Sequence, residues 1–198
     1  AEFSTRSNFS FLEGASHPEE LAVTAMRLGH GALGLADRNT VAGVVRAHMA
    51  AKEAKLAYHP GTRLVFSDGT PDITAYPRNR AAWGRLCRLL TTGNLRGAAL
   101  EEGSIVRLEP VQALRAAFGK SVRLAAVPGF SVSDRHWLEM AAADARACGV
   151  SLMAVNDVTC HAPSRRPLAD VLTSIRLHEP VARAGFALAP NAEGHLKS

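Results

Sequence analysis

Short apolar runs alternate with stretches of helical periodicity along most of this chain. Residues 32–36 are apolar at every position, as in a strand that is buried on both faces. In the stretch before them, Leu21, Ala25 and Leu28 fall on one helical face. Because adjacent parallel strands are joined by crossover helices, this alternation predicts an α/β fold of right-handed β-α units around a parallel sheet. The pattern leaves open whether that sheet is doubly wound or closed into a barrel.

The same alternation continues toward the carboxyl end. Further strands are predicted at residues 64–66, 73–75, 122–127 and 151–155. Further helices are predicted from apolar spacing over residues 83–90, 111–118 and 137–148. Residues 95–106 fit no element.

A helix is also predicted after Asp37, with Asn39 or Thr40 as its N-cap. Its apolar stripe is expected to comprise Val41, Val44, Val45, His48, Met49 and the stem of Lys52.

Composition limits the class of protein. A chain of 198 residues that is 47% hydrophobic has the size of one globular domain. It has neither a signal-like start nor an apolar stretch of about 18 residues, so we expect a cytoplasmic location and no membrane contact. The formal charge of +5 would suit a nucleic-acid partner, but the basic residues are scattered along the sequence.

Four segments carry a resemblance to a known family: residues 7–15 (SNFSFLEGA), 32–44, 51–63 and 154–163 (AVNDVTCHAP). They resemble motifs of the PHP domain of DnaE-type DNA polymerases, the family of the DNA polymerase III alpha subunit. Residues 8–21, 43–48 and 154–172 are similar to its error-prone branch. The resemblance implies a PHP-type distorted, TIM-barrel-like β/α barrel with about seven strands. It also implies a PHP domain over residues 1–190, with residues 191–198 beginning a connection to an absent polymerase region.

The family resemblance also implies a metal site of His, Asp and Glu side chains at the strand ends. Five positions hold residues that differ from the family's ligands: Ser4, Arg6, Arg38, Arg63 and Thr159. Three carboxylates of the set remain: Glu13, Asp37 and Asp157. We therefore expect a degenerate site with no metal, no cofactor and no catalytic residue in this domain. Magnesium would serve only the absent polymerase region.

Three new arginines beside three carboxylates suggest a specific hypothesis. Arg6, Arg38 and Arg63 would occupy the space of the lost metals and neutralise the remaining acids through guanidinium–carboxylate pairs. Local roles stay open: Asp37 as a helix cap, Glu13 in an exposed turn, and Asp157 in a turn at a strand end.

Other reactive side chains have ordinary interpretations. His17, His48 and His161 are scattered, which favours structural roles over a shared metal site. Cys160 and His161 are adjacent on an extended segment and would point to opposite faces, which disfavours a catalytic pair.

The resemblance implies a structural module of an error-prone translesion polymerase. Its expected partners are its own polymerase domains, DNA through the parent enzyme, and other translesion or replication proteins. The fragment itself is expected to be a monomer that does not polymerise. Two alternatives remain: a metal-dependent phosphoesterase, as an exonuclease or a small-molecule phosphatase, and a stand-alone degenerate domain that only binds a partner.

Overall fold

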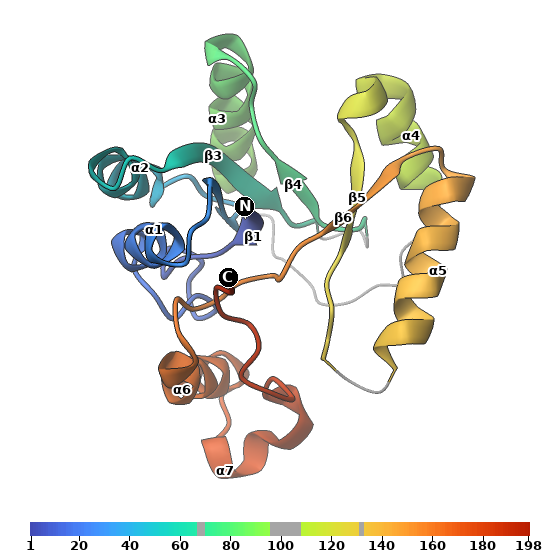
Figure 1. Ribbon diagram of the computed structural model, residues 1–198. Coiled ribbons are helices and arrows are strands. Elements are labelled where there is room, and N and C mark those ends of the chain that lie inside the picture. Colours follow the sequence, from blue (N-terminus) through green and yellow to red (C-terminus); the bar gives the residue numbers. More distant parts are fainter. Residues whose placement is uncertain (67–69, 96–107, 131–132) are drawn as a thin grey trace. The chain divides into compact units, whose positions relative to one another are not determined.

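The computed structural model describes all residues except 67–69, 96–107 and 131–132 (Figure 1). The chain divides into two compact units, each of which is described by itself. Unit 1 comprises Ala1–Leu64, Ile73–Ala98 and Asn156–Ser198. Unit 2 comprises Val65–Asp72 and Ala99–Val155.

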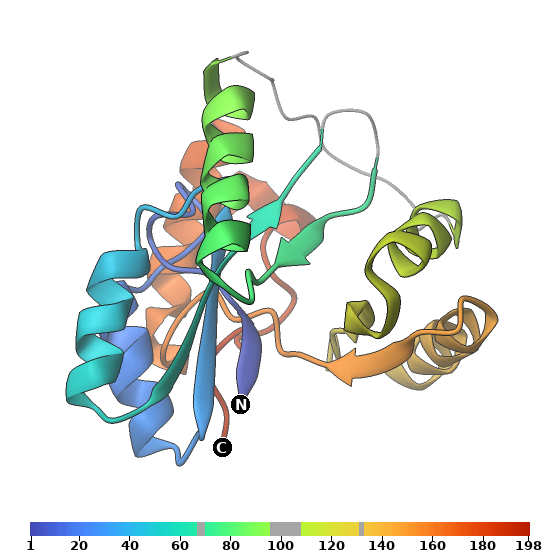
Figure 2. The same ribbon diagram turned by 90° about the horizontal axis from the view of Figure 1, so that it is seen from above.

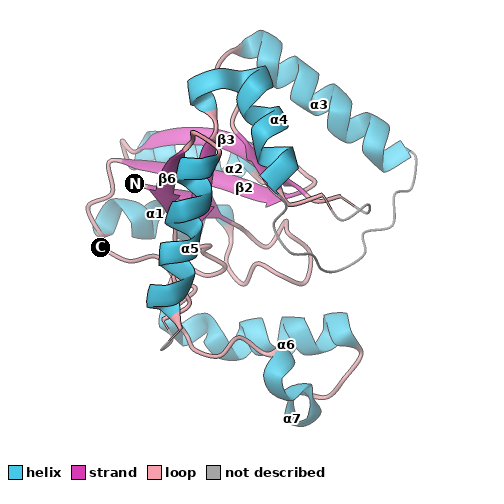
Figure 3. Ribbon diagram, turned by 90° about the vertical axis from the view of Figure 1, so that its right-hand side faces the viewer, coloured by secondary structure: helices cyan, strands magenta, loops and turns pink. Residues whose placement is uncertain are grey.

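Unit 1 contains a four-stranded sheet in the order β1-β2-β3-β4. Its strands are β1 (Glu2–Thr5), β2 (Ala32–Arg38), β3 (Ala57–Leu64) and β4 (Ile73–Ala75). The first three are parallel, and β4 runs antiparallel to β3. The helices of unit 1 are α1 (Pro18–Arg27), α2 (Val44–Glu53), α3 (Arg80–Leu95), α6 (Arg166–Leu177) and α7 (Val181–Ala184), with short 3-10 turns at Pro163–Arg165 and Gly185–Ala187. Figure 3 shows α6 and α7 as neighbours.

Unit 2 contains a parallel pair of strands, β5 (Arg123–Ala126) and β6 (Ser151–Ala154). Helix α5 (Asp134–Ala147) connects the two strands and packs on both. Helix α4 (Leu108–Phe118) and a 3-10 turn at Gly119–Ser121 precede β5. This arrangement is one β-α-β crossover.

The predicted α/β class is confirmed. The described residues form six strands in two sheets, so the predicted count of about seven is not confirmed. Of residues 95–106, which fitted no element, Leu95 ends α3 and the others lie outside the described residues.

The core of unit 1 lies between β2 and the helices α1 and α2, which Figures 1 and 2 show side by side. It contains Leu21, Ala22, Ala25, Leu33, Leu35, Ala47, Ala51, Leu56, Val158 and Leu196. The apolar run predicted as a doubly covered strand is β2, and its five central residues are buried.

Helix α2 differs from its prediction in two ways. It begins at Val44 with Gly43 as the N-cap, so neither Asn39 nor Thr40 caps it. Its buried residues are Ala47 and Ala51, whereas Val45 and Met49 of the predicted stripe are 71% and 62% exposed. Alanine lets α2 approach α1 closely, and an apolar spacing pattern does not distinguish a small contact residue from a large exposed one.

Two glycines of the sheet make room for Tyr76. A Cβ on Gly61 of β3 would lie 2.5 Å from the Tyr76 ring, and one on Gly34 of β2 would lie 2.8 Å from the Tyr76 hydroxyl. That hydroxyl donates a hydrogen bond to the Phe3 carbonyl in β1, and the two rings meet edge to face. Tyr76 therefore covers three strands at once.

Within the described part of the chain, every helix is too short or too polar to cross a bilayer.

The Tyr76 contact predicts opposite effects for two glycine substitutions. Gly61→Ala should destabilise the fold by about 1–3 kcal/mol, because the added methyl group would overlap the Tyr76 ring. The hydrogen bond from the Tyr76 hydroxyl to Phe3 keeps that ring from moving aside. Gly84→Ala should stabilise it by about 0.5–1 kcal/mol, because Gly84 lies inside α3 with nothing within 4 Å of the added methyl group. Urea denaturation of both variants measures the two effects, and equal unfolding free energies would refute the Tyr76 contact.

Candidate functional site

The carboxyl ends of β1, β2 and β3 bring the predicted site residues together. Arg6 directly follows β1, and Arg38 pairs in register with Arg63 at the ends of β2 and β3. Asp157 reaches the same edge because Val158 forms a parallel bridge with Thr5 of β1. The backbone of Val158 accepts a hydrogen bond from the Arg6 amide at 2.8 Å and donates one to the Ser4 carbonyl at 2.7 Å.

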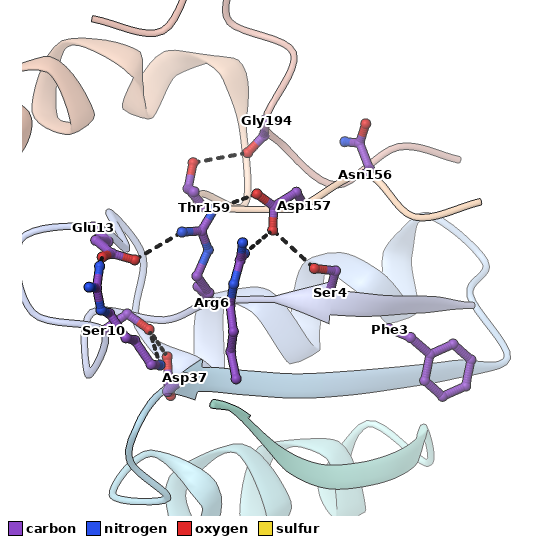
Figure 4. Close-up of polar contacts among 12 residues, drawn as sticks. Phe3, Ser4, Arg6, Ser10, Glu13, Asp37, Asn156, Asp157, Thr159 and Gly194 are labelled. Carbon is purple, nitrogen blue, oxygen red and sulfur yellow. Dashed lines mark hydrogen bonds and ion pairs between the residues drawn. The ribbon is translucent and has the colours of Figure 1, made fainter. Parts of the chain in front are cut away.

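Five charged side chains form a continuous chain of ion pairs at this edge. Arg6 lies at its centre, with Nη1 2.9 Å from Oε2 of Glu13 and Nη2 2.7 Å from Oδ2 of Asp157. Arg38 pairs with the other oxygen of Glu13, and Nη1 of Arg63 lies 2.9 Å from Oδ1 of Asp157. Figure 4 shows Glu13 and Asp157 converging on Arg6. Arginines and carboxylates thus alternate along the chain, with arginines at both ends.

Glu13 is held ionised by this network. Burial by itself raises the pKa of the Glu13 carboxyl, but the charges and hydrogen bonds of Arg6 and Arg38 outweigh it, so that the pKa lies below its ordinary value. Its side chain is only 11% exposed. Glu13 is therefore not in an exposed turn.

Asp37 has a different environment, and the structure corrects its expected arginine partner. Oδ1 of Asp37 accepts hydrogen bonds from the Ser7 amide and the Ser10 hydroxyl, both at 2.7 Å. Oδ2 accepts one from the Ser7 hydroxyl at 2.8 Å. Hydroxyls take the place of the guanidinium because residues 7–10 fold directly over the end of β2, where Asp37 is 1% exposed.

The serine contacts also decide the role of Asp37. Its partners are in the loop after β1 rather than at the start of α2, so it does not cap that helix. Burial raises the pKa of the Asp37 carboxyl above its ordinary value, although the bonds from Ser10 and Ser7 lower it in part. Asp37 therefore ties the loop that carries Glu13 to the sheet.

Asp157 combines a turn with an ion-pair role. Its backbone is left-handed, with φ at 45°, which aspartate tolerates better than most residues. Its Oδ1 also accepts a hydrogen bond from the Ser4 hydroxyl at 3.0 Å. The neighbouring Asn156 amide donates to the carbonyls of Glu193 and His195. Residues near both ends of the chain therefore contact the Asn156–Asp157 turn.

The remaining predicted positions make structural contacts. The Thr159 hydroxyl donates to the Gly194 carbonyl at 3.3 Å, and Nδ1 of His161 lies 2.8 Å from the Ser16 hydroxyl. Burial raises the pKa of the Cys160 thiol and lowers that of His161. Across the described ranges, no group of three or more His, Cys, Asp or Glu side chains is arranged to hold a metal ion.

The sequence-based site lacked two residues that the structure adds, Ser7 and Ser10, which are partners of Asp37. Ser4 was among the expected site positions, and the structure adds its contact with Asp157. The one available signal was the pair of hydroxyl side chains, Ser7 and Ser10, in the loop that also carries Glu13.

The ion-pair network predicts that Arg6→Met costs about 3 kcal/mol of unfolding free energy, because two carboxylates of low exposure each lose a partner. Arg46→Met is the matched control, since Arg46 pairs with Glu19 at 49% and 39% side-chain exposure and should contribute at most about 1 kcal/mol. Urea denaturation compares the two. A similar small loss in both variants would show that the network contributes no more than a surface pair.

The two buried carboxylates predict opposite pH trends. The pKa of Asp37 is raised in the folded state, so its contribution to stability is largest at low pH and is lost as the pH rises through that pKa. The pKa of Glu13 is lowered, so its contribution is present above its ordinary pKa and is lost on acidification. From about pH 7 to about pH 3, the parent protein should gain stability relative to Asp37→Asn and lose it relative to Glu13→Gln. Urea titrations across this range measure both differences, and trends of the same sign would contradict the assignment.

Comparison with known proteins gives relatives over the full chain. It is 54% identical to an error-prone DNA polymerase of Mesorhizobium japonicum, with 100% of this chain and 20% of the relative covered. It is 48% identical to error-prone DNA polymerase 1 of Rhizobium meliloti, with 99% and 20% covered. The chain thus spans about a fifth of the length of these relatives.

A crystal structure from Bifidobacterium adolescentis, provisionally named a metal-dependent phosphoesterase, superposes with a TM-score of 0.46 at 14% identity, over 79% of this chain and 86% of that one. The sequence model of the PHP domain matches residues 2–131, which is more than half of the chain. The chain therefore belongs to the PHP domain family.

Proposed function

We propose that this chain is the PHP module of an error-prone DNA polymerase and that its strand-edge site is structural. The names of its relatives support the polymerase assignment. The distorted barrel of about seven strands, a PHP domain ending at residue 190 and a cytoplasmic location belong to the same proposal. A connection over residues 191–198 belongs to it as well, although Leu196 of that segment is buried in the core of unit 1.

The observation that carries the structural role is the position of Arg6 between Glu13 and Asp157. The carboxylate oxygens of Glu13 and Asp157 accept hydrogen bonds from the guanidinium groups of arginines. A divalent cation at this edge would have to displace arginines that already neutralise its ligands.

The donor set does not fit a metal cluster. Hard and borderline cations in hydrolytic sites take carboxylate and imidazole ligands, whereas this edge presents three guanidiniums. Both carboxylate oxygens of Asp37 already accept hydrogen bonds from serines of the loop after β1. We therefore derive no hydrolytic step for these residues.

Polymerisation belongs, in this proposal, to a polymerase region of the longer protein, where magnesium would support nucleotidyl transfer. The expected partners are that region, DNA, and other translesion or replication proteins. The present chain should add no nucleotide to a primer.

An exposed apolar stripe on α6 supports a bracing role. Leu168, Val171 and Ile175 recur at three- and four-residue steps and are 40%, 44% and 52% exposed. A cavity of about 270 Å³ lies beside them, lined by Phe11, Leu168 and Leu172 among others. Such a surface fits contact with another part of a larger protein.

The alternative function is a metal-dependent phosphoesterase, and a reconstructed site separates the two. The proposal predicts that manganese or zinc does not raise the melting temperature of the parent chain, and that the chain does not hydrolyse a generic phosphodiester. A variant with family ligands restored (Ser4→His, Arg6→His, Arg38→His, Arg63→Glu, Thr159→His) should bind metal and melt at a higher temperature when metal is added.

Elemental analysis of the purified parent chain completes this test. Several bound metal ions, with hydrolysis that Asp37→Ala abolishes, would replace the structural role with phosphoesterase activity. Absence of metal and of turnover in the parent, with metal binding gained in the reconstructed variant, would support arginine replacement.

A further inference from the structure

Helix α3 carries a run of positive charge that no acidic residue interrupts. Residues 73–95 contain four arginines, Arg78, Arg80, Arg85 and Arg88, and no Asp or Glu. All four are exposed. Figure 2 shows α3 in green. The basic residues, which are scattered along most of the sequence, are therefore concentrated locally on α3 and in the residues just before it.

These guanidiniums have no partners within the part of the chain that the structure describes. None of the four forms a side-chain hydrogen bond or ion pair with another described residue. Six other arginines of unit 1 do pair with carboxylates: Arg6, Arg38, Arg46, Arg63, Arg165 and Arg166. The charge on α3 is therefore available to an external anion.

The geometry of α3 places this charge on one outward face. At 3.6 residues per turn, Arg80, Arg85 and Arg88 fall within about 140° of arc, opposite Leu86 and Leu90. Those two leucines are only 8% exposed, so they hold the helix with its arginines outward. Because Leu86 and Leu90 are already buried, they are not available as the apolar face that an amphipathic helix inserts into a membrane interface.

We propose that this face of α3 binds the phosphodiester backbone of DNA. From Arg80 to Arg88 the helix rises about 12 Å, which matches about three phosphates of one strand along the duplex axis. Guanidiniums are the usual donors to backbone phosphates, and such contacts position a protein without reading sequence. The choice of DNA over other polyanions rests on the proposed function, whereas the anion site itself rests on α3 alone.

The test measures binding of the full 198-residue chain to a labelled duplex of mixed sequence by fluorescence anisotropy, at about 50 and 200 mM salt. Replacing Arg78, Arg80, Arg85 and Arg88 with alanine should weaken binding at least about tenfold at the lower salt. The slope of the logarithm of the binding constant against the logarithm of the salt concentration should become shallower by the loss of about three phosphate contacts. The matched control replaces four exposed arginines elsewhere, Arg27, Arg135, Arg146 and Arg183. Both variants change the formal charge from +5 to 5 − 4 = +1. The control should lose less than about twofold.

Two further measurements separate recognition from folding and from general charge. Arg80→Glu should weaken DNA binding without lowering the melting temperature, because a carboxylate is favourable in the first turn of a helix. A polyglutamate competitor should displace the chain less effectively than unlabelled duplex.

Equal losses in the two quadruple variants, no binding by the parent chain, or equal competition by polyglutamate would each overturn the DNA assignment. Metal content and phosphodiester hydrolysis should be the same in the parent and in the α3 variants. Failure of this inference is thereby distinguishable from failure of the proposed structural role.

Discussion

Arg6 joins parts of the chain that are more than a hundred residues apart. Its guanidinium contacts Glu13 in the loop after β1 and Asp157 in the segment that pairs alongside β1. Asp157 in turn contacts Arg63 at the end of β3, and Glu13 contacts Arg38 at the end of β2. The edge formed by the three strand ends thus depends on the Arg6 guanidinium and its two carboxylate partners, Glu13 and Asp157. Without Arg6, each of these carboxylates of low exposure would lose one of its two guanidinium partners.

Two carboxylates of this edge illustrate different physical solutions to the same problem. Glu13 is stabilised in its charged form by two guanidiniums, whereas Asp37 has only the dipoles of hydroxyl and amide groups. Burial disfavours the charged form of a carboxylate, and neighbouring dipoles offset this effect less completely than a full positive charge does. The pKa of Asp37 is therefore raised, while that of Glu13 is lowered. A PHP domain can therefore keep acids at its strand ends when arginines and serines satisfy them.

Two groups of arginines in unit 1 differ in their surroundings. Those at the strand ends are partly buried and satisfied by carboxylates, and they hold the fold together. Those of α3 are exposed and have no ion pairs among the described residues. The same side chain serves both roles because guanidinium is always charged and can bind either a carboxylate or a phosphate. The position of an arginine in the fold, rather than its residue type, therefore decides whether it pairs with a carboxylate of the chain or is exposed to solvent.

The sequence by itself determined the α/β class, the buried strand β2 and the group of charged residues at the strand ends, because apolar period and family motifs are local properties of the chain. It did not determine the partners of those charges. Asp37 binds Ser7 and Ser10 rather than an arginine because the loop after β1 folds over the end of β2. Likewise, Ala47 and Ala51 face the core while Val45 and Met49 do not, because the close approach of α1 selects small residues. Tertiary structure decided these points, since hydrogen-bond partners and contact distances depend on segments that are remote in the sequence.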